Sequence, residues 1–226
     1  MLAAPESGGQ QAAATGWRAA QGKPTTTLLL RHGQTALSAQ RRFAGRGDVP
    51  LTDLGLQQAA AAAAALAQRG IDLVLTSPLL RAQQTARAVA DAAGVQIEVD
   101  EALVETDFGS WEGMTFGEVM ARWPDEMAAW LADPDVAPPG GESFAAVGLR
   151  VNAALDRILA AHQGQIVVVV SHVTPIKSIV CRVLLAPAAA LFRFHLDVAA
   201  VSEAAWFADG PALLRSLNDT AHLRSL

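Results

Sequence analysis

Two short apolar runs, far apart in the chain, each end abruptly at a histidine. The first is Thr25–Leu30, which stops at Arg31-His32-Gly33. The second is Gln165–Val170, which contains four consecutive valines and stops at Ser171-His172. Runs of this length, rich in β-branched residues and without polar alternation, are typical of strands buried on both faces of a parallel sheet. We therefore expect an α/β fold whose central strands deliver polar groups to one edge of a sheet.

Helical segments separate the predicted strands. Thr52 is a suitable N-cap for the alanine-rich run Asp53–Gln68, and Gly70 closes it. Ser77-Pro78 follows a second buried run and opens another helix. Strands are expected at Ile71–Thr76, Val95–Val99, Phe192–Leu196, Val198–Phe207 and Leu213–Leu217, and helices at Leu79–Ala93, Phe116–Arg122, Asp125–Leu131, Glu142–His162 and Thr174–Leu185. This alternation predicts a three-layer sandwich, with a mostly parallel central sheet between helices on both faces.

Composition limits the type of protein. The chain has 226 residues, of which 51% are hydrophobic, enough for one folded domain over residues 25–226. Residues 1–24 are rich in Ala, Gly, Gln and Ser and predict a flexible leader or linker. The single cysteine excludes an internal disulfide, no secretory or membrane-spanning pattern is visible, and a net charge of -5 disfavours nucleic-acid binding. We expect a cytoplasmic protein that binds neither membranes nor nucleic acid.

Cationic side chains follow three of the predicted strands. Arg31-His32 and Ser171-His172 come directly after two of them, and Arg81 lies in the helix after the third. Because parallel strands end at the same edge of a sheet, two histidines and two arginines are expected to converge there. The planar fork of arginine matches phosphate oxygens, and helix N-termini add positive charge. A carboxylate also suits such a site, but four cationic groups suit a dianion better.

At this point the chain resembles the histidine phosphatase superfamily, also called the phosphoglycerate mutase-like fold. The matching motifs, in family order, are Leu30–Thr35, Gly47–Gly55, Ser77–Ala86, Glu105–Gly113, Pro139–Ser143, Val170–His172 and Leu217–Leu223. Within the superfamily, the runs Val104–Gly109 and Ser171–Lys177 are most similar to α-ribazole phosphatases. They are also similar to the acid phosphatase half of actinobacterial proteins fused to ribonuclease H. The leader then resembles the linker that follows an N-terminal ribonuclease H domain in such relatives.

The resemblance implies a role for each main site residue. His32 would take the phosphoryl group on a ring nitrogen. Arg31, Arg81 and His172 would grip the phosphate oxygens. Glu105 would protonate the leaving oxygen and then activate water. These roles agree with the physics, because fixed cations attract an anionic substrate and a protonated carboxyl group assists a poor leaving group.

Further residues carry weaker expectations. Gln34, Ser38 and Val173 fall at positions that line the phosphate pocket in the family. Ser38 stands where asparagine is common and Val173 where glycine is common, so one phosphate contact is expected to be shorter or water-mediated and the entrance beside His172 narrower. Glu112 competes with Glu105 for the acid role, which we assign to Glu105.

The remaining polar residues of interest are expected to be structural. Asp107 is assigned to fixing its loop, and His162, His195 and His222 to structural roles. Specificity is expected to reside in the Glu105 loop and in two segments, Phe116–Trp130 and Phe43–Arg46.

The predicted activity is a metal-independent phosphomonoesterase that works through a phosphohistidine and needs no cofactor. The resemblance points to α-ribazole 5'-phosphate, a cobalamin precursor, or another small phosphate ester as substrate. Three alternatives stay open, namely a phosphoglycerate mutase, a broad-specificity acid phosphatase and a non-enzymatic phosphoprotein-binding module. The sequence leaves monomer and homodimer equally open.

Overall fold

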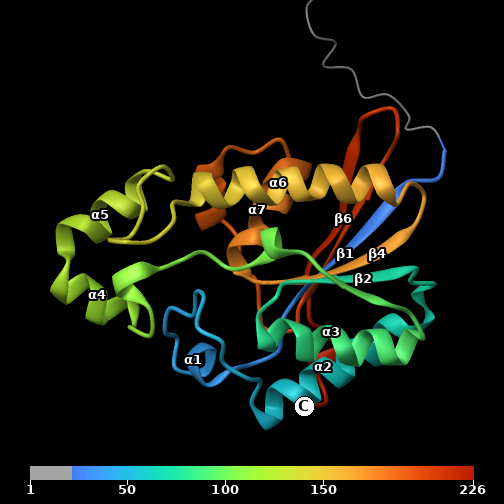
Figure 1. Ribbon diagram of the computed structural model, residues 1–226, viewed down its shortest axis with the longest axis horizontal. Coiled ribbons are helices and arrows are strands. Elements are labelled where there is room, and N and C mark those ends of the chain that lie inside the picture. The colour runs from blue at the N-terminus through green and yellow to red at the C-terminus, as the bar shows by residue number, and fades with distance from the viewer. Residues whose placement is uncertain (1–21) are drawn as a thin grey trace, which may run out of the picture.

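The computed structural model describes residues 22–226 and contains a six-stranded sheet (Figure 1). The strand order is β3-β2-β4-β1-β5-β6. The first four strands are parallel to one another, whereas β5 is antiparallel to both of its neighbours, β1 and β6. The strands are β1 (Thr25–Arg31), β2 (Leu73–Thr76), β3 (Ile97–Val99), β4 (Ile166–Ser171), β5 (Val201–Trp206) and β6 (Ala212–Asp219). The predicted leader lies almost wholly outside the described residues, so the division at residue 24 stays a prediction.

Helices cover both faces of the sheet, which confirms the predicted three-layer α/β class. Helices α2 and α3 lie on one face, and α6 and α7 lie on the other (Figure 1). The helices are α1 (Ala36–Ala39), α2 (Asp53–Leu66), α3 (Leu80–Ala93), α4 (Phe116–Arg122), α5 (Pro124–Ala132), α6 (Phe144–Ala161) and α7 (Val173–Val183), with short 3-10 turns at Ala67–Arg69, Glu101–Leu103, Gly109–Trp111, Ala188–Phe192 and Ala221–Leu223. In the described part of the chain, no helix is long and apolar enough to cross a membrane.

The two apolar runs form neighbouring strands at the centre of the sheet. Strands β1 and β4 pair in parallel, with Leu30 opposite Val170 and Arg31 opposite Ser171. Side chains alternate between the two faces along each strand. Leu28 and Leu30 therefore pack toward α2 and α3, whereas Leu29 packs toward α6 and α7, and all three are fully buried. This register brings His32 and His172 to the same level at the carboxyl edge.

Local signals fix the chain around that edge. The Thr52 hydroxyl accepts a hydrogen bond from the Gly55 N–H and caps α2, as predicted. A Cβ atom on Gly33 would lie 2.4 Å from the Gly55 carbonyl oxygen, so glycine is needed for this backbone contact. Pro78 precedes the first turn of α3 rather than opening it, and Asp48 caps that helix by accepting from the Leu80 N–H.

One predicted strand is wrong. The segment Phe192–Leu196 ends a 3-10 turn and then continues as irregular loop. Its alternating apolar residues resemble a strand, but side chains elsewhere bind carbonyls in and beside this segment. Arg31 donates to the Leu196 carbonyl and Lys177 donates to the Leu191 carbonyl. The other predicted elements occur where they were expected, with ends displaced by no more than three residues.

A smaller apolar cluster supports the part of the molecule beyond the carboxyl edge of the sheet. Helices α4 and α5 lie there, to one side of the main layers (Figure 1). Met127 and Trp130 of α5 pack with Trp111, Phe108 and Phe144. This cluster is a second apolar core, which supports the loops at the carboxyl edge.

Candidate active site

His32 follows β1 directly and is held by backbone contacts. Its N–H donates to the Ser171 carbonyl at 3.0 Å, and its ring Nδ1 lies 2.7 Å from the Gly33 carbonyl oxygen. Because a carbonyl only accepts hydrogen bonds, Nδ1 carries the ring proton and Nε2 has the free lone pair. Burial lowers the pKa of His32 well below its usual value, and the charges of Arg31 and Arg81 lower it further. The ring is therefore neutral, with a lone pair available at Nε2.

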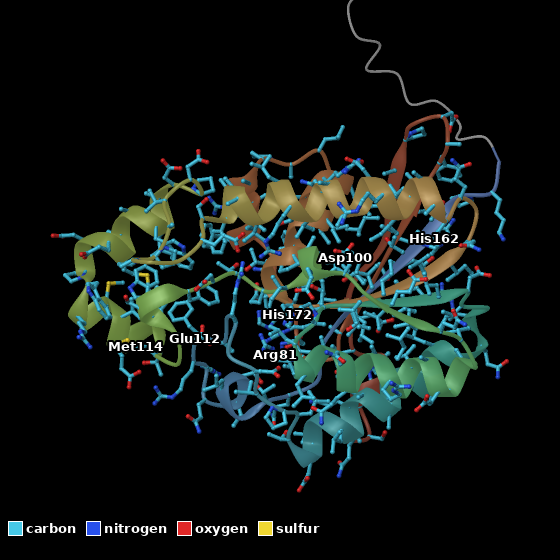
Figure 2. All side chains as sticks on the ribbon, in the orientation of Figure 1. Arg81, Asp100, Glu112, Met114, His162 and His172 are labelled. Atoms are coloured by element: carbon cyan, nitrogen blue, oxygen red, sulfur yellow. The ribbon has the colours of Figure 1, made fainter. Side chains whose placement is uncertain are left out.

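His172 packs beside His32 and contacts Arg81. The two imidazole centroids are 5.1 Å apart. Arg81 Nε donates to Nδ1 of His172 at 3.3 Å, so Nε2 of His172 carries the proton and donates to the Ser77 hydroxyl at 2.7 Å. Burial, and then the neighbouring His32 and Arg81, keep the pKa of His172 well below its usual value. Figure 2 shows Arg81 and His172 together near the middle of the molecule, at the carboxyl edge of the sheet.

The fully buried Arg81 is oriented by one loop, residues 44–47, which we call the clamp loop. Its Nη1 donates to the Gly47 carbonyl, and its Nη2 donates to the carbonyls of Ala44 and Gly45, at 2.7 to 3.1 Å. Burial lowers the pKa of Arg81, although nearby carboxylates oppose this. The loop therefore fixes the direction of the guanidinium at the base of the site.

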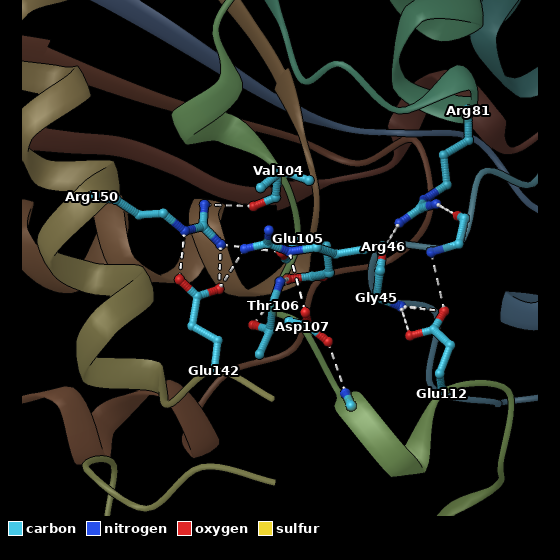
Figure 3. A network of polar contacts seen from close by, with 12 residues as sticks. Gly45, Arg46, Arg81, Val104, Glu105, Thr106, Asp107, Glu112, Glu142 and Arg150 are labelled. Atoms are coloured by element: carbon cyan, nitrogen blue, oxygen red, sulfur yellow. Dashed lines mark hydrogen bonds and ion pairs between the residues drawn. The ribbon is translucent and has the colours of Figure 1, made fainter. Parts of the chain in front are cut away.

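Glu112 holds the clamp loop from its other side. Its carboxylate accepts from the N–H of Gly45 at 2.9 and 3.0 Å and from that of Gly47 at 3.3 Å (Figure 3). It is absent from the residues that line the cavity described below. Glu112 therefore supports the backbone on which Arg81 depends, and this placement weighs against a role as the acid.

Arg31, the last residue of β1, has a buried side-chain N–H donor without a hydrogen-bond partner among the described residues. Its Nη1 donates to the Leu196 carbonyl at 2.7 Å, while its Nε is buried and has no hydrogen-bond partner among the described residues. Burial lowers the pKa of Arg31 to about 10, and the charges of Glu105 and Asp197 oppose this shift. The side chain is thus still a cation at neutral pH. An unpaired buried N–H is costly unless a ligand satisfies it.

Glu105 lies at the N-terminus of α7. Its carboxylate accepts from the N–H groups of Val173 at 3.0 Å, Thr174 at 3.2 Å and Thr106 at 2.8 Å. It lines the same cavity as Arg31 and His32, which Glu112 does not. Asp107 accepts from the Gly109 N–H and braces its own loop.

The cavity lined by Arg31, His32 and Glu105 has a volume of about 610 Å³, and neither Arg81 nor His172 is among its lining residues. Its lining also includes the basic groups Arg41, Arg42, Lys177 and His195. Its walls carry the aromatic residues Phe43, Phe108, Trp130, Phe144 and Phe192. The lining therefore suits a ligand that carries both an anionic group and an apolar or aromatic group.

The other predicted pocket residues are engaged in local hydrogen bonds. The Gln34 side chain accepts from the Thr52 hydroxyl at 3.0 Å. Ser38 lines the cavity, and its hydroxyl accepts from the Thr35 N–H in a capping box and also donates to the Thr35 carbonyl. Val173 lines the cavity while its N–H is bound to Glu105. Phosphate contacts by these three residues stay predictions.

The remaining histidines lie away from this centre. His162 caps α6 and accepts on its carbonyl from the Thr25 hydroxyl, at the opposite end of the sheet (Figure 2). His222 contacts the Ala199 carbonyl near the C-terminus. His195 lines the cavity, in a loop rather than the predicted edge strand. Among residues 22–226, no group of three or more His, Cys, Asp or Glu side chains is arranged to hold a metal ion.

Sequence reasoning missed several residues around the site. Part of the cavity is lined by Lys177 and by residues of the segment Leu191–Val198. This lining was not expected, because part of the segment was predicted to be an edge strand. Of the predicted specificity segment Phe116–Trp130, only Trp130 lines the cavity. Arg150, which binds the backbone around Glu105, was not singled out. Its contacts go to carbonyl groups, which every residue has, so no residue-type signal marks them.

Comparison with known proteins decides the family. A sequence profile of the histidine phosphatase superfamily (branch 1) matches residues 27–220. The chain belongs to this superfamily. It is 50% identical over 209 residues to Bifunctional protein Rv2228c of Mycobacterium tuberculosis. The aligned region covers 92% of this chain and 57% of that protein. The chain thus spans little more than half the length of that relative.

Solved structures of the superfamily agree with this assignment. The α-ribazole phosphatase from Shigella flexneri is 30% identical, with a TM-score of 0.78 and coverage of 86% of this chain and 96% of that one. The mycobacterial glucosyl-3-phosphoglycerate phosphatase Rv2419c is also 30% identical, with a TM-score of 0.79 and coverage of 87% and 99%. The family predicted from the motifs is therefore confirmed.

Proposed function

We propose that this histidine phosphatase hydrolyses a small phosphate monoester by way of a phosphohistidine at Nε2 of His32, with no metal ion. The observation that carries the proposal is the position of His32 and Glu105 on one cavity, with the free lone pair of His32 at Nε2. Arg31 and Arg81 lie close enough to His32 to lower its pKa and supply the positive charge that a phosphate needs, while His172 packs beside the His32 ring.

The first step transfers the phosphoryl group to the enzyme. The Nε2 lone pair forms a bond to phosphorus, and the bond from phosphorus to the ester oxygen breaks. Protonated Glu105 gives its proton to that oxygen, which leaves as an alcohol. The Gly33 carbonyl accepts from Nδ1–H and stabilises the positive charge that develops on the ring.

The second step releases phosphate. Water gives a proton to the Glu105 carboxylate while its oxygen attacks phosphorus, and the phosphorus–nitrogen bond breaks. The electron pair returns to Nε2, and inorganic phosphate leaves. The cationic Arg31 side chain lines the cavity and stabilises the charge on the phosphoryl oxygens in both steps, which is the kind of prearranged electrostatic stabilisation that lowers such barriers.

The aromatic walls support α-ribazole 5'-phosphate as the natural substrate. Its leaving group carries an aromatic base, which suits a cavity lined by five aromatic side chains. One of the solved relatives is an α-ribazole phosphatase, but another acts on a different phosphate ester. A broad-specificity acid phosphatase is therefore the second candidate. Phosphoglycerate mutase activity is less well supported, because it requires a site that protects the phosphohistidine from water.

The relative from Mycobacterium tuberculosis bears on the wider protein. Its name describes it as bifunctional, and this chain matches 57% of its length. We propose that the rest of that relative holds the ribonuclease H domain that the motif resemblance suggests. Residues 25–226 of this chain would then correspond to the phosphatase half.

The test is a panel of substrates without added metal. α-Ribazole 5'-phosphate, 4-nitrophenyl phosphate and 3-phosphoglycerate are incubated with the protein, and inorganic phosphate is measured. We expect phosphate release, with the highest kcat/KM for α-ribazole 5'-phosphate. Similar kcat/KM values for the first two substrates would favour the broad-specificity candidate. Isomerisation of 3-phosphoglycerate without phosphate release would reject the phosphatase mechanism.

A further inference from the structure

We propose that Arg150 is a positioning residue that, together with Glu142, holds the backbone of Glu105 at the distance needed for proton transfer. The inference rests on the proposed function, because it concerns the acid of that reaction. Arg150 belongs to the 18-residue helix α6, whose buried face packs in the main core. The residues it holds, 102–107, form an irregular stretch that we call the acid segment.

Arg150 binds three carbonyl groups of the acid segment. Its Nη1 donates to the carbonyls of Ala102 and Val104, both at 2.7 Å, and its Nη2 donates to the carbonyl of Glu105 itself at 3.1 Å. Figure 3 shows the guanidinium reaching from α6 across to Val104 and Glu105. The segment has no strand partner, so these bonds replace the ladder that a sheet would supply.

Glu142 orients Arg150 and ties the segment at a second point. Its carboxylate accepts from Nε of Arg150 at 2.8 Å and from Nη2 at 2.9 Å, which is a bidentate pair. The Glu142 N–H donates to the Asp107 carbonyl at 2.8 Å. Burial opposes ionisation of Glu142, but the hydrogen bonds and charge of Arg150 outweigh it and lower the pKa of Glu142. The pair is therefore ionised at neutral pH.

All five N–H groups of the Arg150 guanidinium have acceptors in these contacts. None is left to bind a substrate, so the residue acts through Glu105 and not on the phosphate. A lysine has three donors and no planar fork, so it cannot satisfy the same set. The site distinguishes arginine from lysine by geometry, although both carry one positive charge.

The opposite end of Glu105 is fixed independently. Its carboxylate is held by the N–H groups of Val173 and Thr174 at the start of α7. The turn before Glu142 also touches the acid segment, since a Cβ on Gly141 would lie 2.4 Å from the Asp107 carbonyl oxygen. With the carboxylate set by α7 and the backbone set by Arg150, the side chain is restrained at both ends. A misplacement of about 1 Å at such a site costs on the order of 100-fold in rate.

The leaving group of the substrate provides a readout specific to the acid. Benzyl phosphate and 4-nitrophenyl phosphate are similar in size, but benzyl alkoxide must be protonated as it leaves, whereas 4-nitrophenolate leaves readily without a proton. For Arg150→Lys we expect kcat/KM to fall about 30- to 100-fold with benzyl phosphate and less than about 3-fold with 4-nitrophenyl phosphate. Glu105→Gln should show the same selectivity with a larger loss.

Two further variants make the test decisive. Arg157→Lys is the matched control, because Arg157 lies on the same helix and pairs with Asp100 without touching Glu105, so both substrates should keep the wild-type kcat/KM. If Arg150→Lys fails to fold, Glu142→Gln replaces it and should show a smaller loss with the same selectivity. Equal losses on both substrates, or no loss on either, would overturn the proposal. If wild-type protein hydrolyses neither substrate, the proposed function itself fails.

Discussion

Acid should destabilise this fold through its two buried histidines. Burial, and then neighbouring cationic and histidine side chains, lower the pKa values of His32 and His172 well below 6.5. In the unfolded chain each side chain titrates near about 6.5. The unfolded state therefore binds more protons than the native state below that pH, so the free energy of unfolding falls as the pH falls. The stability is fully present above the unfolded value and is lost below it.

The size of the effect follows from the linkage relation. If both rings stay neutral in the native protein, the two histidines together should lower the free energy of unfolding by about 3 kcal/mol between pH 7.5 and pH 5.5. The carboxylates and the other histidines contribute their own dependence, so the comparison must be made between variants.

Urea unfolding at the two pH values in phosphate-free buffer measures this. Replacing His32 by Asn keeps a donor near the Gly33 carbonyl and should remove roughly half of the pH dependence that the two histidines produce. His195→Asn is the comparison variant, because the His195 side chain is 76% exposed, and it should change the dependence less than His32→Asn does. If His32→Asn retains the full wild-type dependence, His32 is not held neutral and the argument for its nucleophilicity is refuted.

Three further substitutions test other parts of the site. Arg81→Lys should lower kcat about 100- to 1,000-fold in a phosphate-release assay, because lysine lacks the planar guanidinium that the clamp loop orients. An unchanged kcat would show that the orientation of Arg81 by the clamp loop is not needed for catalysis. Gly141→Ala should lower the free energy of unfolding in urea by about 1–3 kcal/mol, because its Cβ would meet the Asp107 carbonyl oxygen at 2.4 Å; an unchanged unfolding midpoint would contradict this packing. Phe192→Ala removes a ring that is 43% exposed and should lower kcat/KM about 3- to 10-fold for benzyl phosphate relative to glycerol 3-phosphate; an equal effect on both would exclude Phe192 as a contact for the leaving group.

The central sheet was predictable because its signals are local. The runs that end at His32 and His172 are too apolar and too β-branched to lie anywhere except between two helical layers. Their pairing in register then follows from the common edge of a parallel sheet. The cap at Thr52 was predictable for the same reason, since the capping hydroxyl lies three residues from the N–H it accepts from.

The cavity wall and the positioning contacts were not predictable from local patterns. Phe192–Leu196 alternates like a strand, yet distant Arg31 and Lys177 bind its carbonyl and that of Leu191. Arg150 reaches the acid segment from more than 40 residues away in the chain, and its acceptors are backbone groups. Ser38 shows the limit of a motif position, since its hydroxyl is already bonded to Thr35.

The most direct test of the central claim is to trap the phosphoenzyme. The protein is mixed with radiolabelled substrate, quenched in alkali during turnover and digested, and the labelled peptide and ring nitrogen are identified. The structure predicts an acid-labile, alkali-stable phosphate on Nε2 of His32, because Nδ1 is occupied by the Gly33 carbonyl. Label on another residue, label on Nδ1, or full turnover by His32→Ala without label would contradict the mechanism.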